Sequence, residues 1–334
     1  MDKLHLLLKY SRLFDVLQIA LRWTSLFEKI LIRSGIDAVY FTSTSKRYLL
    51  LNKLPFIIAI FDGCHRDAPE FEEVRSFGEF ERREALFGFA SIKSALVIAN
   101  APELIDLLCR RYGMERDRAI CIPLSPSTYV SRSAPDEAAD AAVLKKYGIE
   151  PGYLFYPAQF WPHKNHAALL AALALLQKQG SSERLVLCGS DRGFIDKIRA
   201  MIADYGLTDK VSIIGFVESS ELAALYRGAL ALVMPTYFGP TNIPPLEAWT
   251  LGTPVIYPEA FKAQAGDAAL LFDYDDPHSL AEAIVSVRSA ETRERLRKAG
   301  YDRLQHFASE IEAGRRQLAF HLERLKNRLV LTRR

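Results

Sequence analysis

Short apolar runs alternate with stretches of helical periodicity along most of this chain. The runs are rich in Val, Ile, Leu and aromatic residues and are bounded by Gly, Pro, Ser or Asn, which is typical of buried strands. Between them, apolar residues recur every three to four positions and predict amphipathic helices. Such alternation predicts an α/β fold in which helices cover both faces of parallel sheets. The expected strands are 37–41, 55–61, 95–99, 119–122, 153–156, 184–188, 211–214, 229–234, 254–257 and 269–272.

A polar segment, 125–140, interrupts this alternation. Its Ser, Pro, Ala and acidic residues are typical of a linker. The length of 334 residues also favours two domains, because one hydrophobic core rarely grows beyond about 250–300 residues. We therefore expect a first domain over 1–140, a second domain over 141–305 and a terminal helix over 306–334.

Composition narrows the class of protein. Apolar residues make up 49% and charged residues 25% of the chain, which is ordinary for a soluble globular protein. The net charge of +3 gives no indication of a nucleic-acid partner. The four cysteines form no CxxC pair, which favours reduced thiols. No apolar run reaches the roughly 18 residues of a membrane span, and no signal-peptide pattern is present. We therefore expect a cytoplasmic protein.

The N-terminal segment, 1–36, is both apolar and basic. Leu13, Leu17 and Leu21 have helical spacing, and Lys and Arg residues are interspersed. One interpretation is a helix docked on the sheet of the first domain. The other is a helix that lies peripherally on the anionic inner face of a membrane. The basic end of the chain favours the second interpretation, because positive charges there would also be attracted to an anionic membrane. These charges are carried by Lys326, Arg328, Arg333 and Arg334.

The segment 235–254, PTYFGPTNIPPLEAWTLGTP, is the most informative stretch. It follows a predicted strand and leads through a turn into a short helix, with Glu247 expected in the first helical turn. Free backbone N–H groups at a helix start favour phosphate, and a carboxylate can accept hydrogen bonds from sugar hydroxyls. Together these features suit a nucleotide sugar.

This segment resembles the signature P-S-x-x-E-G-F-G-x-P-x-L-E-A of family 4 (group 1) glycosyltransferases, which are retaining enzymes of GT-B fold. Glu247 matches the second glutamate of the signature, and Gly239 stands where the first would be. The resemblance implies that Glu247 binds the ribose of the donor. It also implies that Thr241, Asn242 and Ile243 line the donor site, where the amides of Asn242 and Ile243 would stabilise the departing diphosphate. The carboxylate that contacts the transferred sugar in the family is absent.

A second segment, 156–166, resembles the family's G-R-x-x-x-x-K-N motif. Lys164 matches the lysine, and Gln159 stands at the position of the arginine; in the family both side chains grip the donor diphosphate. His163 lies beside the lysine and joins the expected donor site. A lysine ammonium at a helix start can neutralise a leaving diphosphate without a metal.

Three further residues follow strands of the second domain. Gly189 ends one strand and would allow the backbone to approach a ligand closely. Phe216 and Val217 follow the next strand, in a Gly-Phe-Val turn that lines the base pocket in the family. An ordinary turn is the alternative for this pair.

Two groups of residues superficially suggest a metal, and we discount both. His163 and His166 have a spacing that a helix would permit, but no third ligand is evident. Asp273 and Asp275 spell the Asp-x-Asp of metal-dependent GT-A enzymes, but they lie just before Asp276, which is expected to cap a helix. We therefore expect neither a metal site nor a cofactor.

In the first domain, the segment 61–84 resembles a W-D-x-x-H-R turn followed by P-E-F in a subset of the family. Polar residues at the carboxyl end of a strand lie where open α/β sheets place ligands, so Asp62, His65 and Arg66 are expected to face the active cleft. His65 is the candidate to replace a catalytic histidine of the family, and a loop histidine bound to backbone is the alternative. The charge run 79–84 is expected to be a solvated helix face.

The resemblance implies two Rossmann-like domains with parallel sheets that face a cleft. The first domain is expected to be shortened, because the family's first strand and Gly-Gly loop are not visible before residue 37. The last helix is expected to cross back to the first domain. The implied function is the retaining transfer of a hexose from a nucleotide-diphosphate sugar to a glycan or lipid-linked acceptor in cell-surface polysaccharide synthesis. The alternatives are an inactive nucleotide-binding partner subunit and a nucleotide-sugar epimerase.

Overall fold

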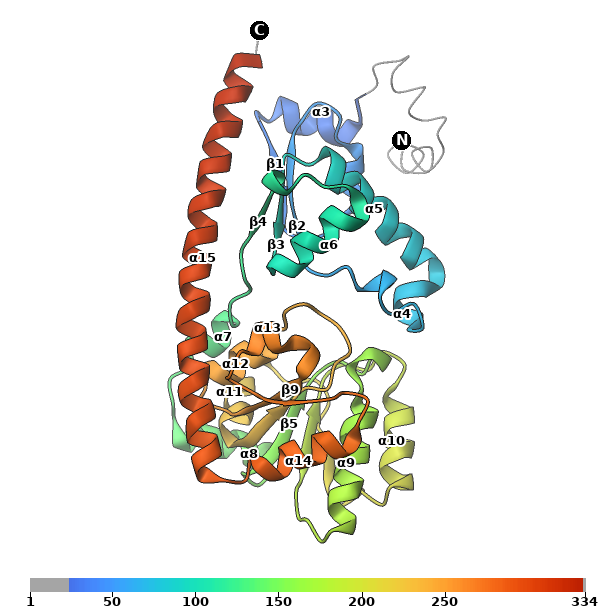
Figure 1. Cartoon of the computed structure of the whole chain (residues 1–334), viewed down its shortest axis with the longest axis vertical. Coiled ribbons are helices and arrows are strands. Elements are labelled where there is room, and N and C mark those ends of the chain that lie inside the picture. Colours follow the sequence, from blue (N-terminus) through green and yellow to red (C-terminus); the bar gives the residue numbers. More distant parts are fainter. Residues whose placement is uncertain (1–23, 333–334) are drawn as a thin grey trace. The chain divides into compact units, whose positions relative to one another are not determined.

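The structure, a computed structural model, describes residues 24–332 and divides into two compact units. The first comprises the chain through Pro123 together with the segment from Glu310 onward, and the second comprises Leu124–Ser309. Each unit contains one parallel β-sheet with helices around it (Figure 1). The predicted α/β class with two parallel sheets is therefore confirmed.

The first unit contains a four-stranded sheet with the order β1-β2-β3-β4. Alternate residues of β2 face opposite ways, because successive side chains of a strand point to opposite faces. Phe56, Ile58 and Ile60 join the core beneath α5 and α6, whereas Ile57 and Ala59 join a smaller core that includes Leu318. The elements are β1 Val39–Phe41, β2 Phe56–Ile60, β3 Leu96–Ala99, β4 Ala119–Cys121, α3 Leu26–Arg33, α4 Glu72–Arg75, α5 Glu79–Lys93 and α6 Pro102–Tyr112.

Helix α3 is the described part of the apolar and basic N-terminal segment, and it is docked on the first unit. Its Glu28 is fully buried, and one carboxylate oxygen accepts hydrogen bonds from the backbone N–H groups of Asn52, Lys53 and Leu54 at 2.6–2.8 Å. Phe27 packs on the core of the sheet. Helix α3 is therefore docked, whereas the helix predicted from Leu13, Leu17 and Leu21 lies outside the described part of the chain.

The last helix is α15 (Ala290–Thr332), which extends to both sides of the domain boundary predicted at residue 306 and contributes to both units. Two glycines in its interior are sites of close packing. A Cβ at Gly300 would come within 2.6 Å of the Trp249 ring, and one at Gly314 within 2.4 Å of the Cys121 carbonyl oxygen at the end of β4. The part of α15 from Glu310 onward runs beside β4 of the first unit (Figure 1).

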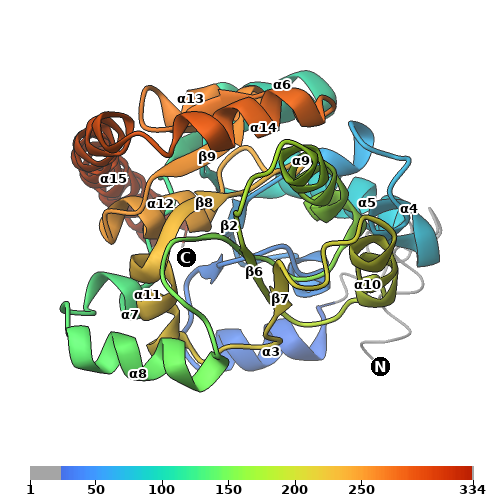
Figure 2. The same cartoon turned by 90° about the horizontal axis from the view of Figure 1, so that it is seen from below.

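The second unit contains a six-stranded parallel sheet with the order β10-β9-β8-β5-β6-β7. Helices α9, α10 and α14 lie on one face, and α8, α11 and α12 on the other (Figure 2). The chain runs from β5 outward through β6 to β7, then returns to β8 and continues the other way, so the strand order reverses between β5 and β8. Ligands of open α/β sheets bind at the carboxyl ends of the strands that flank such a point. The elements are β5 Tyr153–Pro157, β6 Leu185–Cys188, β7 Val211–Ile213, β8 Ala229–Val233, β9 Val255–Pro258, β10 Leu270–Phe272, α7 Thr128–Ser131, α8 Glu137–Tyr147, α9 His166–Lys178, α10 Ile195–Asp204, α11 Ser219–Gly228, α12 Ile243–Thr250, α13 Lys262–Ala265 and α14 Pro277–Ser286.

The segment 125–140, predicted as a linker, is instead part of the second unit. It contains α7 and the start of α8, which both pack against α11. Arg227 of α11 forms two hydrogen bonds of 2.6 Å with the Asp140 carboxylate, and Val130 is buried. The division between the units therefore follows Pro123 rather than residue 140, because these contacts tie the polar segment to the second sheet.

Candidate active site

The loops that follow β5 and β8 meet at the carboxyl ends of these neighbouring strands. The backbone N–H of Tyr237 donates to the His163 carbonyl oxygen at 2.9 Å, and the Thr236 hydroxyl lies 3.4 Å from the same oxygen. The His163 ring stacks on Phe238, with ring centroids 4.1 Å apart. The structure thus joins the two segments that the sequence singled out, and it does so where the strand order reverses.

A third loop, after β10, packs against the first two. Asn165 donates a side-chain N–H to the Tyr274 carbonyl oxygen at 3.3 Å, and the rings of Tyr237 and Tyr274 meet edge to face. Asp275 lies 3.4 Å from the Tyr237 hydroxyl, so it supports the loops. Asp276 caps α14 through the His278 N–H, as the sequence predicted.

Lys164 lies at the end of the 3₁₀ turn Pro162–Lys164, directly before the start of α9. Its carbonyl oxygen accepts a hydrogen bond from the buried Tyr156 hydroxyl at 2.9 Å, which ties the lysine backbone to the end of β5. Asn165 adopts a left-handed conformation with φ 53°, and its side chain caps the helix through the Ala168 N–H. The local sequence therefore places a cation beside a helix N-terminus, which favours anions.

His166, the first residue of α9, is buried and has no hydrogen-bond partner on either ring nitrogen within residues 24–332. Its ring lies 5.0 Å from both Phe160 and Tyr156. Burial lowers its pKa to about 3, and the neighbouring charges of Lys164 and His163 act in the same direction. His166 is therefore neutral at physiological pH and belongs to the core.

Gly189 allows two backbone segments to approach each other closely. The segment that approaches it is the loop after β5. Its φ of 152° and its position mean that a Cβ would come within 2.2 Å of the Ala158 carbonyl oxygen. The backbone N–H of Gly189 donates to Gly215 at 2.9 Å, and that of Ala158 donates to Cys188 at 2.9 Å. Glycine is therefore needed to pack the loops after β5 and β6 together.

Gln159, at the position of the expected arginine, holds a different arginine. Its side-chain oxygen accepts hydrogen bonds from the Trp161 indole at 3.0 Å and from Arg192 at 3.1 Å. The Arg192 guanidinium also lies over the Trp161 ring. Sequence reasoning missed Arg192, whose only signal was its place directly after the Gly-Ser-Asp turn that follows β6.

Phe216 and Val217 separate in the structure. Phe216 is 68% exposed, whereas Val217 packs against the core of the second unit. Gly215, with φ 73°, provides the turn before them. Of the pair, only Phe216 is free of the core and presents an aromatic face on which a base could stack.

Glu247 is 6% exposed and lies in the second turn of α12, not in the first turn as predicted. The helix begins earlier because Asn242 has extended backbone and the two prolines that follow Ile243 suit a first helical turn. One carboxylate oxygen accepts a hydrogen bond from the Tyr226 hydroxyl at 2.9 Å. Burial and this carboxylate hold the pKa of Tyr226 well above its usual value, so the tyrosine remains a donor.

The amide of Asn242, which the resemblance predicts to stabilise the diphosphate, is hydrogen-bonded within the protein. Its backbone N–H donates to the Gln264 side-chain oxygen at 2.8 Å, and the Gln264 amide donates back to the Asn242 carbonyl at 2.7 Å. The Asn242 side chain donates to the Tyr257 hydroxyl at 2.6 Å and to the Gly239 carbonyl at 3.2 Å. Asn242 therefore shapes the loop, together with two partners that sequence reasoning missed.

Gly239 has a φ of 114°, a conformation that residues with a Cβ rarely adopt, and a Cβ there would lie 3.0 Å from the Asn242 side-chain oxygen. A glutamate could not occupy this position without a different course of the loop. The absence of the family's first glutamate therefore agrees with the backbone conformation of this loop. Thr241 lies in the same loop, half-buried, and Ile243 is 40% exposed at the start of α12.

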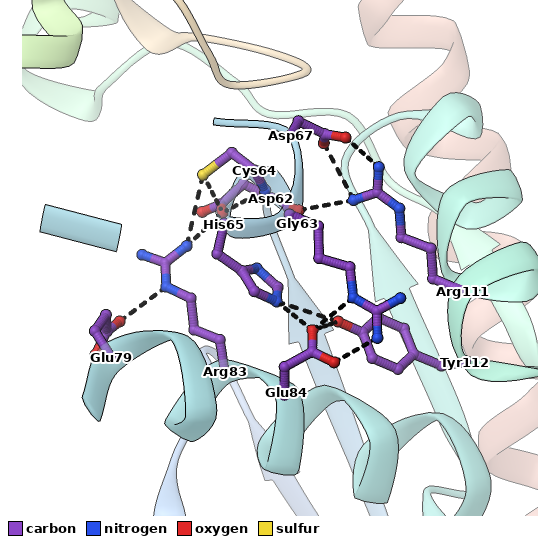
Figure 3. A network of polar contacts seen from close by, with 11 residues as sticks. Asp62, Gly63, Cys64, His65, Asp67, Glu79, Arg83, Glu84, Arg111 and Tyr112 are labelled. Carbon is purple, nitrogen blue, oxygen red and sulfur yellow. Dashed lines mark hydrogen bonds and ion pairs between the residues drawn. The ribbon is translucent and has the colours of Figure 1, made fainter. Parts of the chain in front are cut away.

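In the first unit, His65 is buried and not open to solvent, which corrects the expectation that it faces a cleft. Figure 3 shows the polar residues around it. Its Nε2 lies 2.7 Å from a Glu84 carboxylate oxygen and 3.2 Å from the Tyr112 hydroxyl, and its ring packs edge-on against Phe80 and Phe87. Burial lowers the pKa of His65, although Glu84 opposes this effect. His65 therefore positions its loop.

The charge run 79–84 is not simply a solvated helix face, because it binds the loop that follows β2 (Figure 3). Glu84 accepts hydrogen bonds from Arg66 and from the Tyr112 hydroxyl, both at 2.7 Å. The hydrogen bonds, Arg66 first, lower the pKa of Glu84 to about 2. Arg83 of the same helix donates to Asp62 at 2.8 Å. Charged side chains that were predicted to contact solvent therefore form hydrogen bonds with residues distant in the sequence.

Asp62 and Arg83 also line a small pocket of about 80 Å³ at the carboxyl ends of β1 and β2. Ser43 and Thr44, which follow β1, contribute hydroxyl groups to it. Asp62 is held by Arg83 and by the Cys64 thiol at 3.0 Å, and burial raises the pKa of that thiol. The pocket therefore offers carboxylate, guanidinium and hydroxyl groups, the set that binds a polar ligand.

Comparisons with known proteins agree with this geometry. Residues 142–303 match the family model of the glycosyl transferases group 1. The chain is 27% identical over 209 residues to the O-antigen chain mannosyltransferase B of Escherichia coli, an alignment that covers 61% of this chain and 54% of that protein. The chain thus spans about half the length of this curated relative.

Solved structures show the same fold. A glycosyltransferase from Rickettsia africae has a TM-score of 0.69 at 16% identity. The alignment covers 90% of this chain and 80% of the Rickettsia chain. Anabaena HepE in complex with UDP and glucose has a TM-score of 0.70 at 15% identity. The alignment covers 89% of this chain and 80% of the HepE chain. The fold is therefore that of GT-B-like glycosyltransferases, and residues 142–303 of the second unit are similar to the glycosyl transferases group 1.

Proposed function

We propose that the protein is a retaining, family 4 glycosyltransferase that moves a hexose from a nucleotide-diphosphate sugar to a glycan or lipid-linked acceptor. The observation that carries the proposal is the junction of the loops after β5 and β8, in which Tyr237 and Thr236 hold the His163 carbonyl beside Lys164. The family match and the E. coli relative, named as a mannosyltransferase, support it. The Anabaena structure, which is a complex with UDP and glucose, supports a nucleotide-sugar donor.

In this proposal, the second unit binds the donor. Lys164 and the first amides of α9 hold the diphosphate, because a cation and a helix N-terminus both favour phosphate. Arg192, oriented by Gln159, contributes a second cation near the same loops. Glu247 accepts a hydrogen bond from the ribose, and Phe216 stacks on the base. Asn242 and Gly189 keep the loops in register without a direct contact to the donor.

During transfer, the bond between the anomeric carbon and the diphosphate oxygen breaks as the acceptor hydroxyl adds on the same face of the sugar. The acceptor proton passes to the departing phosphate oxygen, and the anomeric carbon keeps its configuration. Charge accumulates on the leaving diphosphate, and Lys164 stabilises it in the transition state. The pocket at Asp62 in the first unit contributes polar groups for the acceptor, and the network of His65, Glu84 and Tyr112 positions its walls.

The proposed acceptor class and location are supported by one of the relatives and by the chemistry of the acceptor. The E. coli relative is named for the O-antigen chain, which supports a role in cell-surface polysaccharide synthesis. A lipid-linked acceptor would suit an enzyme placed peripherally at the inner face of the membrane. Within residues 24–332, no helix has both the length and the apolar character needed to cross a bilayer.

The proposal is tested by incubating purified protein with a panel of GDP- and UDP-hexoses, with and without EDTA. We expect release of the nucleoside diphosphate from one donor, faster with a glycan acceptor, and we expect the rate to survive the chelator. If the protein binds a nucleotide sugar but releases no nucleoside diphosphate, the inactive partner subunit is favoured. If it converts the nucleotide sugar to its epimer in the absence of an acceptor, the epimerase is favoured. Failure to bind any nucleotide would contradict the proposal.

A further inference from the structure

A basic pocket lies in the first unit at the amino ends of its strands. Its volume is about 340 Å³. The lining residues are Ile57, Ala95, Leu96, Asp117, Arg118, His321, Arg324, Leu325 and Arg328. Ala95 and Arg118 directly precede β3 and β4, whereas the Asp62 pocket lies at the opposite, carboxyl end of the sheet. The basic pocket is therefore separate from the candidate active site.

The protein itself holds one of the three arginines of this pocket in place. Arg118 donates to the carbonyl oxygens of Ile92, at 2.8 Å, and Ser94, which fixes its guanidinium at the pocket wall. Arg324 and Arg328 lie one turn apart on α15, and the half-buried Leu325 between them faces the sheet. The packing of α15 on the sheet thus brings side chains distant in the sequence around one cavity.

In the described part of the chain, these arginines have no carboxylate partner. Within residues 24–332, Arg118, Arg324 and Arg328 form no ion pair, although Arg315 of the same helix pairs with Glu312 at 2.6 Å. Asp117 is the acidic residue that lines the pocket, against three guanidinium groups. The cavity therefore carries an excess of positive charge that the described protein itself does not neutralise.

We propose that this pocket binds a phosphate group of a ligand other than the nucleotide sugar. The planar guanidinium presents paired N–H donors that match phosphate oxygens, and His321 adds a further polar group to the wall. Exposed apolar side chains border the site: Ile92 is 70% exposed beside Arg118, and Val330 and Leu331, just beyond Arg328, are 65% and 79% exposed. A lipid phosphate and a free phosphate share this chemistry, and the apolar border suits the lipid.

The test compares the full-length protein with two double variants. Arg324→Gln with Arg328→Gln removes two charges from the pocket, and Arg315→Gln with Arg316→Gln removes two charges from exposed positions of α15 outside it. Sedimentation with vesicles of phosphatidylglycerol and phosphatidylcholine is measured at low salt, with pure phosphatidylcholine as the neutral comparison. Calorimetry with inorganic phosphate measures the free anion, and circular dichroism checks folding.

We expect the pocket variant to lose about tenfold or more in affinity in at least one arm, while the control variant changes little. Loss in the vesicle arm identifies a lipid phosphate, and loss in the phosphate arm alone identifies a small soluble ligand. The proposal is overturned if the wild-type protein binds neither, or if the two variants lose affinity equally. It does not depend on the glycosyltransferase activity, because neither readout involves a donor.

Discussion

The backbone N–H of Tyr237 donates to the carbonyl oxygen of His163 at 2.9 Å. This bond joins the loop after β5 to the loop after β8, two segments that are far apart in the chain. Both strands end at the edge of the sheet where the strand order reverses. The lysine that follows His163 is therefore held at the position where an α/β sheet binds its ligand.

Lys164 should be required for nucleotide binding. Loss of a charged hydrogen bond to phosphate costs about 1.5–3 kcal/mol, or roughly tenfold or more in affinity. Lys164→Ala should therefore weaken UDP or GDP binding by that order in calorimetry. Lys178→Ala, at the exposed opposite end of α9, is the matched control and should bind normally. Equal affinities in the two variants would show that Lys164 does not contact the nucleotide.

Glu247 should contribute to the same site through the ribose. Glu247→Ala should reduce nucleoside diphosphate affinity about tenfold, because a charged acceptor is lost. The Tyr226 hydroxyl would also lose its partner, at a cost of about 1–3 kcal/mol in the free energy of unfolding. Tyr226→Phe separates the two effects, since it removes this hydrogen bond and keeps the carboxylate. If Tyr226→Phe weakens binding as much as Glu247→Ala, the role of Glu247 is structural.

Gly189→Ala should destabilise the protein strongly. The new Cβ would lie 2.2 Å from the Ala158 carbonyl oxygen, so two backbone segments must move apart. Overpacking typically costs about 1–3 kcal/mol, and the unfavourable φ adds to it. Gly193→Ala is the control, because Gly193 also has positive φ, 85°, but has nothing within 4 Å of a Cβ. Chemical denaturation should show a clearly larger loss for Gly189→Ala; equal losses would contradict the packing argument.

His166 should make the protein sensitive to acid. Its pKa falls from 6.5 in the unfolded chain to about 3 in the folded protein. Between these values the unfolded state binds a proton that the folded state does not, so stability falls as the pH decreases from 6.5 toward 3. His166→Phe should flatten this part of the profile of the free energy of unfolding against pH. The exposed His278→Gln should leave the profile unchanged, and an unaltered profile in His166→Phe would refute the assignment.

Glu84 should stabilise the first unit in a way that acid removes. Its folded pKa of about 2 lies below its ordinary value of 4.5, so its contribution is present above 4.5 and is lost as the pH falls through 2. Glu84→Gln should therefore lower the melting temperature at neutral pH, and its difference from the wild-type protein should shrink in acid. Glu81→Gln, an exposed neighbour on α5, serves as the control. A difference that does not change with pH would indicate that the charge of Glu84 is not involved.

The sequence alone predicted those features that depend on neighbours along the chain. Each expected strand exists, because apolar runs bounded by turn residues specify buried strands locally. The Asp276 cap and the start of α9 directly after Asn165 also follow from local chemistry. The resemblance of the second unit to group 1 glycosyl transferases could be predicted for the same reason, since the residues that carry it lie in short contiguous segments.

Tertiary structure decided where long side chains find their partners. Glu84 binds His65 and Tyr112, and Gln159 binds Arg192, across sequence separations that no periodicity encodes. The amide of Asn242 was expected to meet a ligand, but the Gln264 side chain reaches it first. Such pairings depend on how helices and loops pack on the sheets, because packing decides which distant polar groups come within hydrogen-bonding distance. Buried groups such as His65 and Gln264 must in addition find a partner wherever the fold provides one.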